Sequence, residues 1–272
     1  SPSQSVDIPI MHTIGQFGAS PGKFTMISGT QPTITGTLLI ADGGQNNIQE
    51  FDLLTGAYVR TLFGPGTGLG QFRGPSGMEQ DPNGMLFVAD FHNNRIQVFD
   101  RDYKALSSFG QTGRENGEFF GPLSMSFDPK YERLFVTDSG NSRVVVLDRK
   151  GAALQAVETI GRRAQPGEWG NGTFLSPFGV AVGPKGDIYV SDQDLQLIEK
   201  FDAAGHFVSQ WGGWGTEPGQ FYKPKGISVD QDGNLYVIDF GNHRGQIFDE
   251  NGKFLAIFGE GVLYPPQAAS GK

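Results

Sequence analysis

The 272-residue chain contains no cysteine, which excludes disulfide bonds, thiolate metal sites and cysteine nucleophiles. No run of apolar residues approaches the length of about 18 that a membrane-spanning helix needs, so we expect no membrane insertion. Basic residues are outnumbered by acidic ones, 21 to 29, and the formal net charge is −8. This balance disfavours a uniformly basic nucleic-acid-binding protein. There is no initiator methionine before Ser1, which indicates a fragment of a longer protein.

Glycine is what the chain has in excess, with 41 residues, and phenylalanine follows with 22. A glycine inside a helix costs about 1 kcal/mol relative to alanine, so this composition argues against an all-helical protein. The phenylalanines supply apolar surface for a packed core, which argues against a flexible linker. We therefore expect an ordered protein that is not all-helical.

A repeated pattern predicts the architecture. A hydrophobic residue, any residue and an aspartate recur five times, and the spacings between the aspartates are 48, 48, 54 and 47 residues. A second aspartate follows each of them by ten residues, and a Gly-x-Phe triplet precedes each. The five motif aspartates are Asp42, Asp90, Asp138, Asp192 and Asp239. Five copies of one pattern predict five copies of one structural unit.

Each unit contains four short hydrophobic segments, which we name strands a to d. In the second copy they lie near 76–80, 85–90, 95–100 and 104–109. Four short strands at a period of 40–50 residues predict a blade of a β-propeller. A small residue recurs within strand a, where the innermost strands crowd together and a missing side chain permits close approach; these residues are Gly29, Gly77, Ser124, Gly179 and Gly226.

The segment Val237–Asp249 resembles the NHL repeat, and Val88–Asp100 and Val136–Asp148 resemble it too. The first and fourth copies depart from the pattern, because they carry Asn47 and Leu197 where the others have arginine. The resemblance covers nearly the whole chain and implies one propeller domain over residues 1–272. NHL propellers serve as recognition domains of larger proteins, such as tripartite-motif ubiquitin ligases and bacterial sensor kinases.

The two ends of the chain resemble parts of a sixth blade. Gln4–Asp7 is similar to a strand c, Ile10–Gly15 to a strand d, and Tyr264–Ser270 to the start of a strand a. We therefore favour an all-β propeller of six four-stranded antiparallel blades, with an incomplete closing blade built from both termini. Such closure removes exposed sheet edges. A five-bladed ring is the alternative.

In an antiparallel blade the d–a and b–c loops share one face, which we call the first face. The a–b and c–d loops form the second face. With the motif aspartates counted on the first face, that face carries ten basic and eleven acidic residues, and the second carries nine and sixteen. The acidity of the chain therefore belongs to the second face, where the net charge is −7 against −1 on the first.

We interpret the motif aspartates as structural. Each can accept hydrogen bonds from the amides of the b–c loop and, in three blades, can pair with an arginine five residues on. These arginines are Arg95, Arg143 and Arg244. One such pair per blade is what a repeated scaffold requires.

A candidate binding surface surrounds the loop between the fourth and fifth blades. Trp211 occupies the position of Phe63, Phe109 and Phe258, so we expect it in the core. Trp214 has no counterpart in the other copies, and we expect it to be exposed. Near it in sequence or blade order are the other predicted binding residues, Arg162, Arg163, Tyr222, Lys223, Lys225, Phe240, His243 and Arg244.

Aromatic and arginine side chains are typical of protein recognition surfaces, so a protein or peptide is the first hypothesis for the partner. Single-stranded RNA also uses stacking and positive charge, but the first face is nearly neutral, so RNA is the alternative. A solvated loop with a packed tryptophan is the structural interpretation of the same residues. An insertion of about five residues at 169–174 lies beside this surface.

A metal-dependent lactonase or lyase is the second alternative. The four histidines show no metal-binding spacing, and Glu79 is the only acidic residue near the interior of a strand a. A hard cation needs several oxygen ligands. We therefore expect a non-enzymatic scaffold for recognition, with no catalytic residues, no metal and no cofactor.

Overall fold

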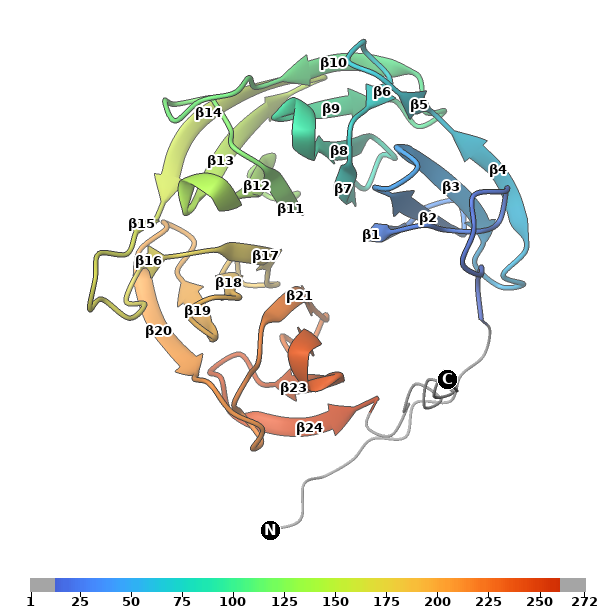
Figure 1. Ribbon diagram of the computed structural model, residues 1–272. Coiled ribbons are helices and arrows are strands. Elements are labelled where there is room, and N and C mark those ends of the chain that lie inside the picture. The colour runs from blue at the N-terminus through green and yellow to red at the C-terminus, as the bar shows by residue number, and fades with distance from the viewer. Residues whose placement is uncertain (1–12, 260–272) are drawn as a thin grey trace, which may run out of the picture.

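The computed structural model describes residues 13–259. These residues form five four-stranded sheets, and in each sheet the strands pair in chain order and antiparallel. The sheets follow one another around a common axis as the blades of a propeller (Figure 1). The predicted all-β propeller of four-stranded antiparallel blades is confirmed. No helix within 13–259 is long and apolar enough to cross a membrane.

Each blade begins with its innermost strand. The first blade consists of β1 (Ile27–Pro32), β2 (Thr37–Asp42), β3 (Asn47–Asp52) and β4 (Tyr58–Leu62). The second consists of β7 (Pro75–Gln80), β8 (Leu86–Asp90), β9 (Arg95–Phe99) and β10 (Ala105–Phe109). The third consists of β11 (Pro122–Asp128), β12 (Arg133–Asp138), β13 (Arg143–Lys150) and β14 (Ala153–Ile160).

The last two blades follow the same plan. The fourth consists of β17 (Pro177–Val182), β18 (Ile188–Asp192), β19 (Leu197–Phe201) and β20 (Phe207–Gly212). The fifth consists of β21 (Pro224–Val229), β22 (Leu235–Asp239), β23 (Arg244–Phe248) and β24 (Phe254–Phe258).

Short elements build the first face. Two d–a loops contain parallel two-residue pairs, β5 (Gly64–Pro65) with β6 (Gln71–Phe72) and β15 (Arg162–Arg163) with β16 (Thr173–Phe174). Three b–c loops form 3₁₀ turns, which are η1 (Phe91–Asn93), η2 (Ser139–Asn141) and η3 (Phe240–Asn242).

Local sequence explains the turns. In the Asp-Pro-Asn-Gly turn of the second blade, the Asp81 carboxylate accepts the backbone N–H groups of Asn83 and Met85 at 2.9 and 2.8 Å. Gly84 then takes a φ of +93°, which disfavours any residue with a Cβ. The chain therefore reverses between β7 and β8, and the two strands pair.

The core lies between neighbouring blades. Strand b alternates its apolar side chains, so that Phe87 and Ala89 of β8 pack toward the third blade while Leu86 and Val88 pack toward the first. The phenylalanine of each Gly-x-Phe triplet inserts into these layers and is at most 5% exposed in all five copies. Apolar burial therefore holds each blade to the next.

The inner strands approach closely, as the small residues in strand a predict. A Cβ on Gly77 would overlap the carbonyl oxygen of Leu123 in the next blade, and a Cβ on Gly29 would overlap that of Ser76. Gly226 of the fifth blade differs, because the nearest atom to its Cβ position within the described chain belongs to Ile238 of its own blade, at 3.9 Å.

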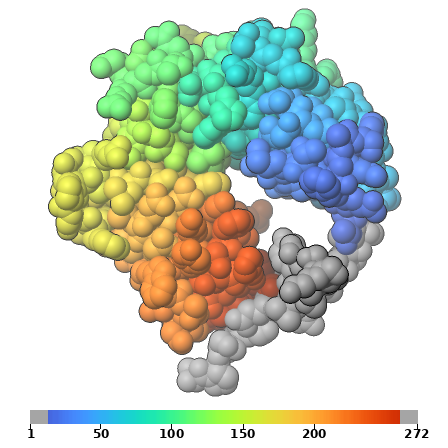
Figure 2. All heavy atoms as spheres, in the orientation of Figure 1, coloured from blue at the N-terminus to red at the C-terminus, as the bar shows by residue number. Residues whose placement is uncertain are grey.

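The number of blades differs from the first expectation. Residues 13–259 form five blades, which is the stated alternative, and not six. Inner strands pack in the order β1, β7, β11, β17 and β21, and Figure 2 shows the first and fifth blades standing apart while all other neighbours touch. The segments assigned to a sixth blade lie outside the described residues, apart from 13–15, which are not a strand. Every described four-stranded sheet belongs to one of the five repeats.

Candidate functional site

The motif aspartates fix the loops of the first face. All five have no exposed surface. Asp90 accepts the backbone N–H of Arg73 in the d–a loop at 2.8 Å and pairs with Arg95 at 2.8 Å. The Asp138–Arg143 pair measures 2.9 Å. Each aspartate thus joins the d–a loop to the b–c loop of its blade, and the surface above them is held rigidly.

In the first and fourth blades, which lack the motif arginine, backbone amides of the b–c loop bind the motif aspartate instead. Asp192 accepts the backbone N–H groups of Asp194 and Leu195, both at 3.0 Å, and Asp42 accepts the equivalent bonds from its own b–c loop. The amide bonds foreseen for every blade are therefore made where the arginine is replaced by Asn47 or Leu197. Elsewhere the arginine side chain takes their place.

Exposed aromatic side chains concentrate on the first face. Within 13–259, its loops expose six large aromatics, which are Phe17, Phe120, Trp169, Trp214, Tyr222 and Phe240. The loops of the second face expose only Tyr131 among the described residues. Single exposed apolar residues are ordinary, but a gathering of them on one face marks an interaction surface.

Trp214 is 74% exposed, as its sequence position predicts. Its backbone bridges Phe221, and Phe17, Pro65 and Thr112 make the same bridge in other blades. The expectation that Trp214 has no counterpart was therefore wrong for the position, although no other blade places tryptophan there. Trp211 packs in the core against Tyr189, with ring centroids 6.3 Å apart.

Tyr222 and Phe240 lie together on the fifth blade. The backbone N–H of Tyr222 donates to Asp239 at 2.8 Å, and the Tyr222 ring lies over Gly241, where a Cβ would overlap it. The Lys225 ammonium lies 3.6 Å from the centroid of the Phe240 ring, a close cation–π contact. Burial, and then the charge of Lys223, lowers the pKa of Lys225.

The two arginines of the candidate surface differ. Arg162 forms a bidentate pair with Glu168 at 2.7 and 2.8 Å. This hydrogen bonding lowers the pKa of Glu168 to about 2 and raises that of Arg162. Arg163 is exposed, and its side chain forms no ion pair with another residue of 13–259. Of the two arginines, only Arg163 has an exposed guanidinium that is not held in an ion pair.

Gly172, within the insertion predicted at 169–174, has a φ of +84° that matches the glycines of the other Gly-x-Phe triplets. Gly172-Thr-Phe174 is therefore the true triplet of the fourth blade, and Trp169, 60% exposed, belongs to the insertion.

Three further predicted residues lie in the same region. Lys223 has a φ of +56° and its backbone N–H donates to Gln196 at 2.6 Å. His243 is exposed and ends η3 in a left-handed conformation. Arg244, which the sequence places on this surface, is only 9% exposed, because it pairs with Asp239 at 2.8 Å and donates to two d–a loop carbonyls. Because these bonds occupy its guanidinium, Arg244 is a structural residue, and its assignment to the binding surface was wrong.

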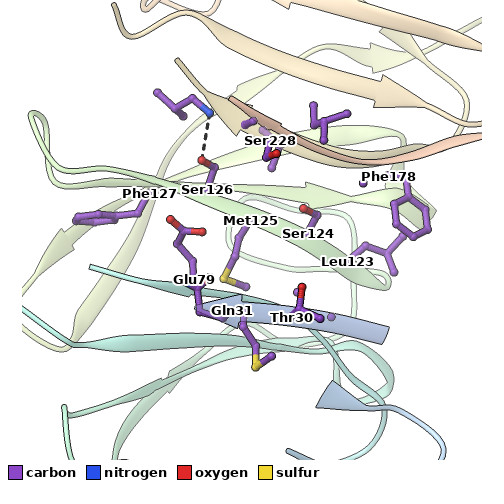
Figure 3. A pocket seen from close by; sticks show the side chains of 18 of the residues that line it. Thr30, Gln31, Glu79, Leu123, Ser124, Met125, Ser126, Phe127, Phe178 and Ser228 are labelled. Atoms are coloured by element: carbon purple, nitrogen blue, oxygen red, sulfur yellow. Dashed lines mark hydrogen bonds between the residues drawn. The ribbon is translucent and has the colours of Figure 1, made fainter. Parts of the chain in front are cut away.

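A second candidate site lies on the propeller axis. The inner strands of all five blades line a cavity of about 650 Å³, shown from close by in Figure 3. Glu79 is the only ionisable residue among its described lining residues. Burial raises the pKa of this carboxyl to about 8, although the backbone N–H of Phe127 donates to it. No group of three or more His, Asp or Glu within 13–259 could hold a metal ion.

Sequence comparison identifies two segments of this chain, residues 72–99 and 221–248, as NHL repeats. They are parts of the second and fifth blades, and the resemblance drawn from the sequence is confirmed there. No curated protein matches the chain.

Several solved structures share the fold at low identity. A streptogramin B lyase matches with a TM-score of 0.60 and 13% identity over 83% of this chain and 66% of its own. A catalytically inactive virginiamycin B lyase from Staphylococcus aureus with quinupristin gives 0.61 and 14% over 93% and 73%. A nidogen/laminin complex gives 0.62 and 16% over 85% and 79%. At these identities the likeness shows the fold alone, and the chain spans slightly less than two thirds of the streptogramin B lyase.

Proposed function

We propose that this NHL-repeat propeller is a non-enzymatic recognition module that binds a protein or peptide on its first face. The centre of the surface is formed by Trp214, Tyr222, Phe240 and Lys225, with Arg163 at its side. The observation that carries the proposal is the uneven distribution of aromatic side chains, six exposed on the first face against one on the second within the described chain. Tryptophan, tyrosine and arginine dominate the binding energy of protein interfaces.

The rigidity of the surface supports the same proposal. The backbone at Tyr222 is fixed by Asp239, the Tyr222 ring packs against Gly241, and the Phe240 ring packs against the Lys225 ammonium. A side chain that is already ordered loses little entropy on binding, and ordering a mobile side chain costs about 0.5–1.5 kcal/mol. A partner can therefore gain most of the contact energy that these rings offer.

The charges favour a protein over RNA. Phosphate binding needs free cations, and each one contributes to a steep loss of affinity with salt. Arg162 is paired with Glu168 and Arg244 is buried with Asp239, so two of the predicted cations have little charge to offer a phosphate. Arg163, Lys223 and Lys225 stay available, which suits a partner with one or two carboxylates.

Among the similar folds, the complex of nidogen and laminin is an assembly of two proteins, and it supports a role in protein binding. The lyase structures keep an enzymatic role as the alternative. Stoichiometric calcium or zinc in the purified protein would favour that alternative.

The test is capture of partners from a lysate of the source cells, followed by mass spectrometry. We expect Trp214→Ala combined with Phe240→Ala to lose the partner that the wild type retains. The matched control removes two exposed apolar side chains of the second face, Leu54→Ala with Tyr131→Ala, and should capture as the wild type does. Equal melting temperatures show that all proteins are folded. Capture that is unchanged in the first variant, or abolished by ribonuclease, would overturn the proposal.

A further inference from the structure

The axial cavity has one polar level. Pairing with strand b aligns one residue of each inner strand at the same height, and these residues are Gln31, Glu79, Ser126, Ala181 and Ser228. The level next to it toward the first face is mainly apolar, with Thr30, Met78, Met125, Val180 and Ile227. Two serine hydroxyls and one amide group thus share this level with a single carboxyl, beside a mainly apolar level.

Glu79 lies at this level without a cationic partner. Figure 3 shows its carboxyl directed into the cavity near Ser126. No Lys or Arg of the described residues forms an ion pair with it, and its protein donor is the backbone N–H of Phe127. The Ser126 hydroxyl accepts the backbone N–H of Val182 at 3.1 Å and keeps its own hydrogen for another acceptor. A carboxyl that faces a cavity with so few donors leaves acceptor capacity unused.

The chemistry of the cavity selects one class of ligand. An anion would meet the Glu79 carboxylate and no lining cation. A hard divalent cation requires six or more oxygen ligands and usually several carboxylates, and this level supplies one. A primary ammonium needs three acceptors, and the carboxyl, a serine hydroxyl and the Gln31 amide oxygen are the types of acceptor that the level provides.

The charge of the molecule also favours a cation. Glu79 is the fifth of the six residues of β7, and strand a runs from the first face to the second, so Glu79 lies toward the second face. That face carries a net charge of −7 by the count of its loops. A field of this sign raises the local concentration of cations at the mouth of the channel.

We propose that the axial cavity binds a small primary alkylamine, with its ammonium on Glu79 and its alkyl chain against Met78 and Met125. The alkyl chain buries apolar surface at the level toward the first face, and each methylene is worth about 0.8 kcal/mol when fully buried. The site is separate from the recognition surface of the first face, and neither proposal depends on the other.

The experiment is a titration with n-butylamine at pH 7, followed through the methyl resonances of the methionines. Met78 and Met125 line the cavity, whereas Met26 lies in the loops of the first face and Met85 in the a–b turn of the second blade. We expect saturable shifts of Met78 and Met125, and none at Met26 and Met85. The neutral isostere 1-butanol should bind at least tenfold more weakly.

Two variants separate the ion pair from simple cavity filling. Glu79→Gln keeps the size of the side chain and should weaken butylamine binding at least tenfold. Glu115→Gln removes a carboxylate from an exposed position on the first face and should leave binding unchanged. Because burial raises the pKa of Glu79 to about 8, an ammonium must displace a proton at pH 7, and affinity should rise roughly fivefold from pH 7 to pH 8. This rise should vanish in Glu79→Gln.

Equal binding of butylamine and 1-butanol, equal binding to the wild type and Glu79→Gln, or the absence of saturable shifts at Met78 and Met125 would each overturn the proposal. Wild-type and variant melting temperatures establish that each protein is folded during the titration.

Discussion

Replacing Glu199 by glutamine should stabilise the protein, and the gain should grow with pH. The same position of strand c carries glutamine in three blades, at Gln49, Gln97 and Gln246. Each of these accepts a glycine N–H at 2.8 Å and donates to a d–a loop carbonyl at 2.7 Å. Glu199 accepts the Gly172 N–H at 2.6 Å, but its Oε1 is buried with no partner within the described residues.

The magnitude follows from the environment of this carboxyl. Glu199 has no exposed surface, and burial, with a smaller effect of the Asp192 charge, raises its pKa to about 8. The unfolded chain ionises near 4.5 and the folded protein near 8, so folding must retain a proton between these values. The contribution of Glu199 to the free energy of unfolding is fully present below pH 4.5 and falls by about 1.4 kcal/mol per pH unit up to about pH 8. The total loss is about 5 kcal/mol at most.

Glutamine does not titrate and keeps its N–H donor at every pH, whereas the carboxyl has a donor only while it is protonated. Thermal unfolding of the wild type and Glu199→Gln at pH 5, 6.5, 8 and 9 measures the difference. We expect the gap in Tm to widen by about 10 °C from pH 5 to pH 8, since 1 kcal/mol shifts Tm by about 2–4 °C in a protein of this size. Gln49→Glu, in the other blade that lacks the motif arginine, is the converse control and should lose stability over the same pH range.

A gap between the wild type and Glu199→Gln that is the same at pH 5 and pH 8 would refute the reasoning. So would a variant that is less stable at every pH. Either result would mean that Glu199 is ionised in the folded protein at neutral pH.

The remaining predictions test the scaffold and the surface. Arg244→Ala leaves Asp239 buried without its cationic partner and should lower the free energy of unfolding, measured in urea, by about 3–5 kcal/mol. Arg163 is exposed, so Arg163→Ala should change it by no more than about 0.5 kcal/mol. Equal losses in the two variants would contradict the structural role assigned to Arg244. Gly77→Ala places a methyl group against the Leu123 carbonyl and should lower stability by about 1–3 kcal/mol, while Gly226→Ala, with its nearest neighbour 3.9 Å away, should be neutral. A cost of Gly226→Ala equal to that of Gly77→Ala would contradict the role assigned to the close approach at Gly77.

The sequence could predict the blades because their signals are local and repeated. Strand ranges in the second copy agree with the structure to within one residue at each end, for example 104–109 against Ala105–Phe109. Alternation and a small residue in strand a recur in all five copies, and a glycine recurs in four of the a–b turns, so an error in one copy is corrected by the others. The number of blades lacked this support, because the segments assigned to a sixth blade are short and match the pattern weakly.

The candidate surface was harder to predict, since exposure depends on neighbours that are distant in sequence. Arg163 faces solvent, whereas Arg244, which follows the motif aspartate Asp239 by five residues, is buried by d–a loop carbonyls. Phe17 was missed, although it lies seven residues before Phe24 as Trp214 lies seven before Phe221. That shared offset was the signal that could have found it.

The role of Glu79 required the structure, because its sequence position says only that it is near the interior of strand a. The level at which it meets Ser126, and the lack of a lysine or arginine partner, follow from the alignment of five inner strands. Glu199 is a similar case, because only its buried oxygen shows that it differs from the glutamines of other blades.

The most direct test of the central claim is a photo-crosslinking measurement. Benzoylphenylalanine is placed at Trp214 in one protein and at Leu54, which is 82% exposed on the second face, in another. After irradiation in lysate, we expect a covalent adduct with one protein partner from position 214 and none from position 54. Adducts of equal yield from both positions, or adducts from position 54 alone, would contradict the assignment of recognition to the first face.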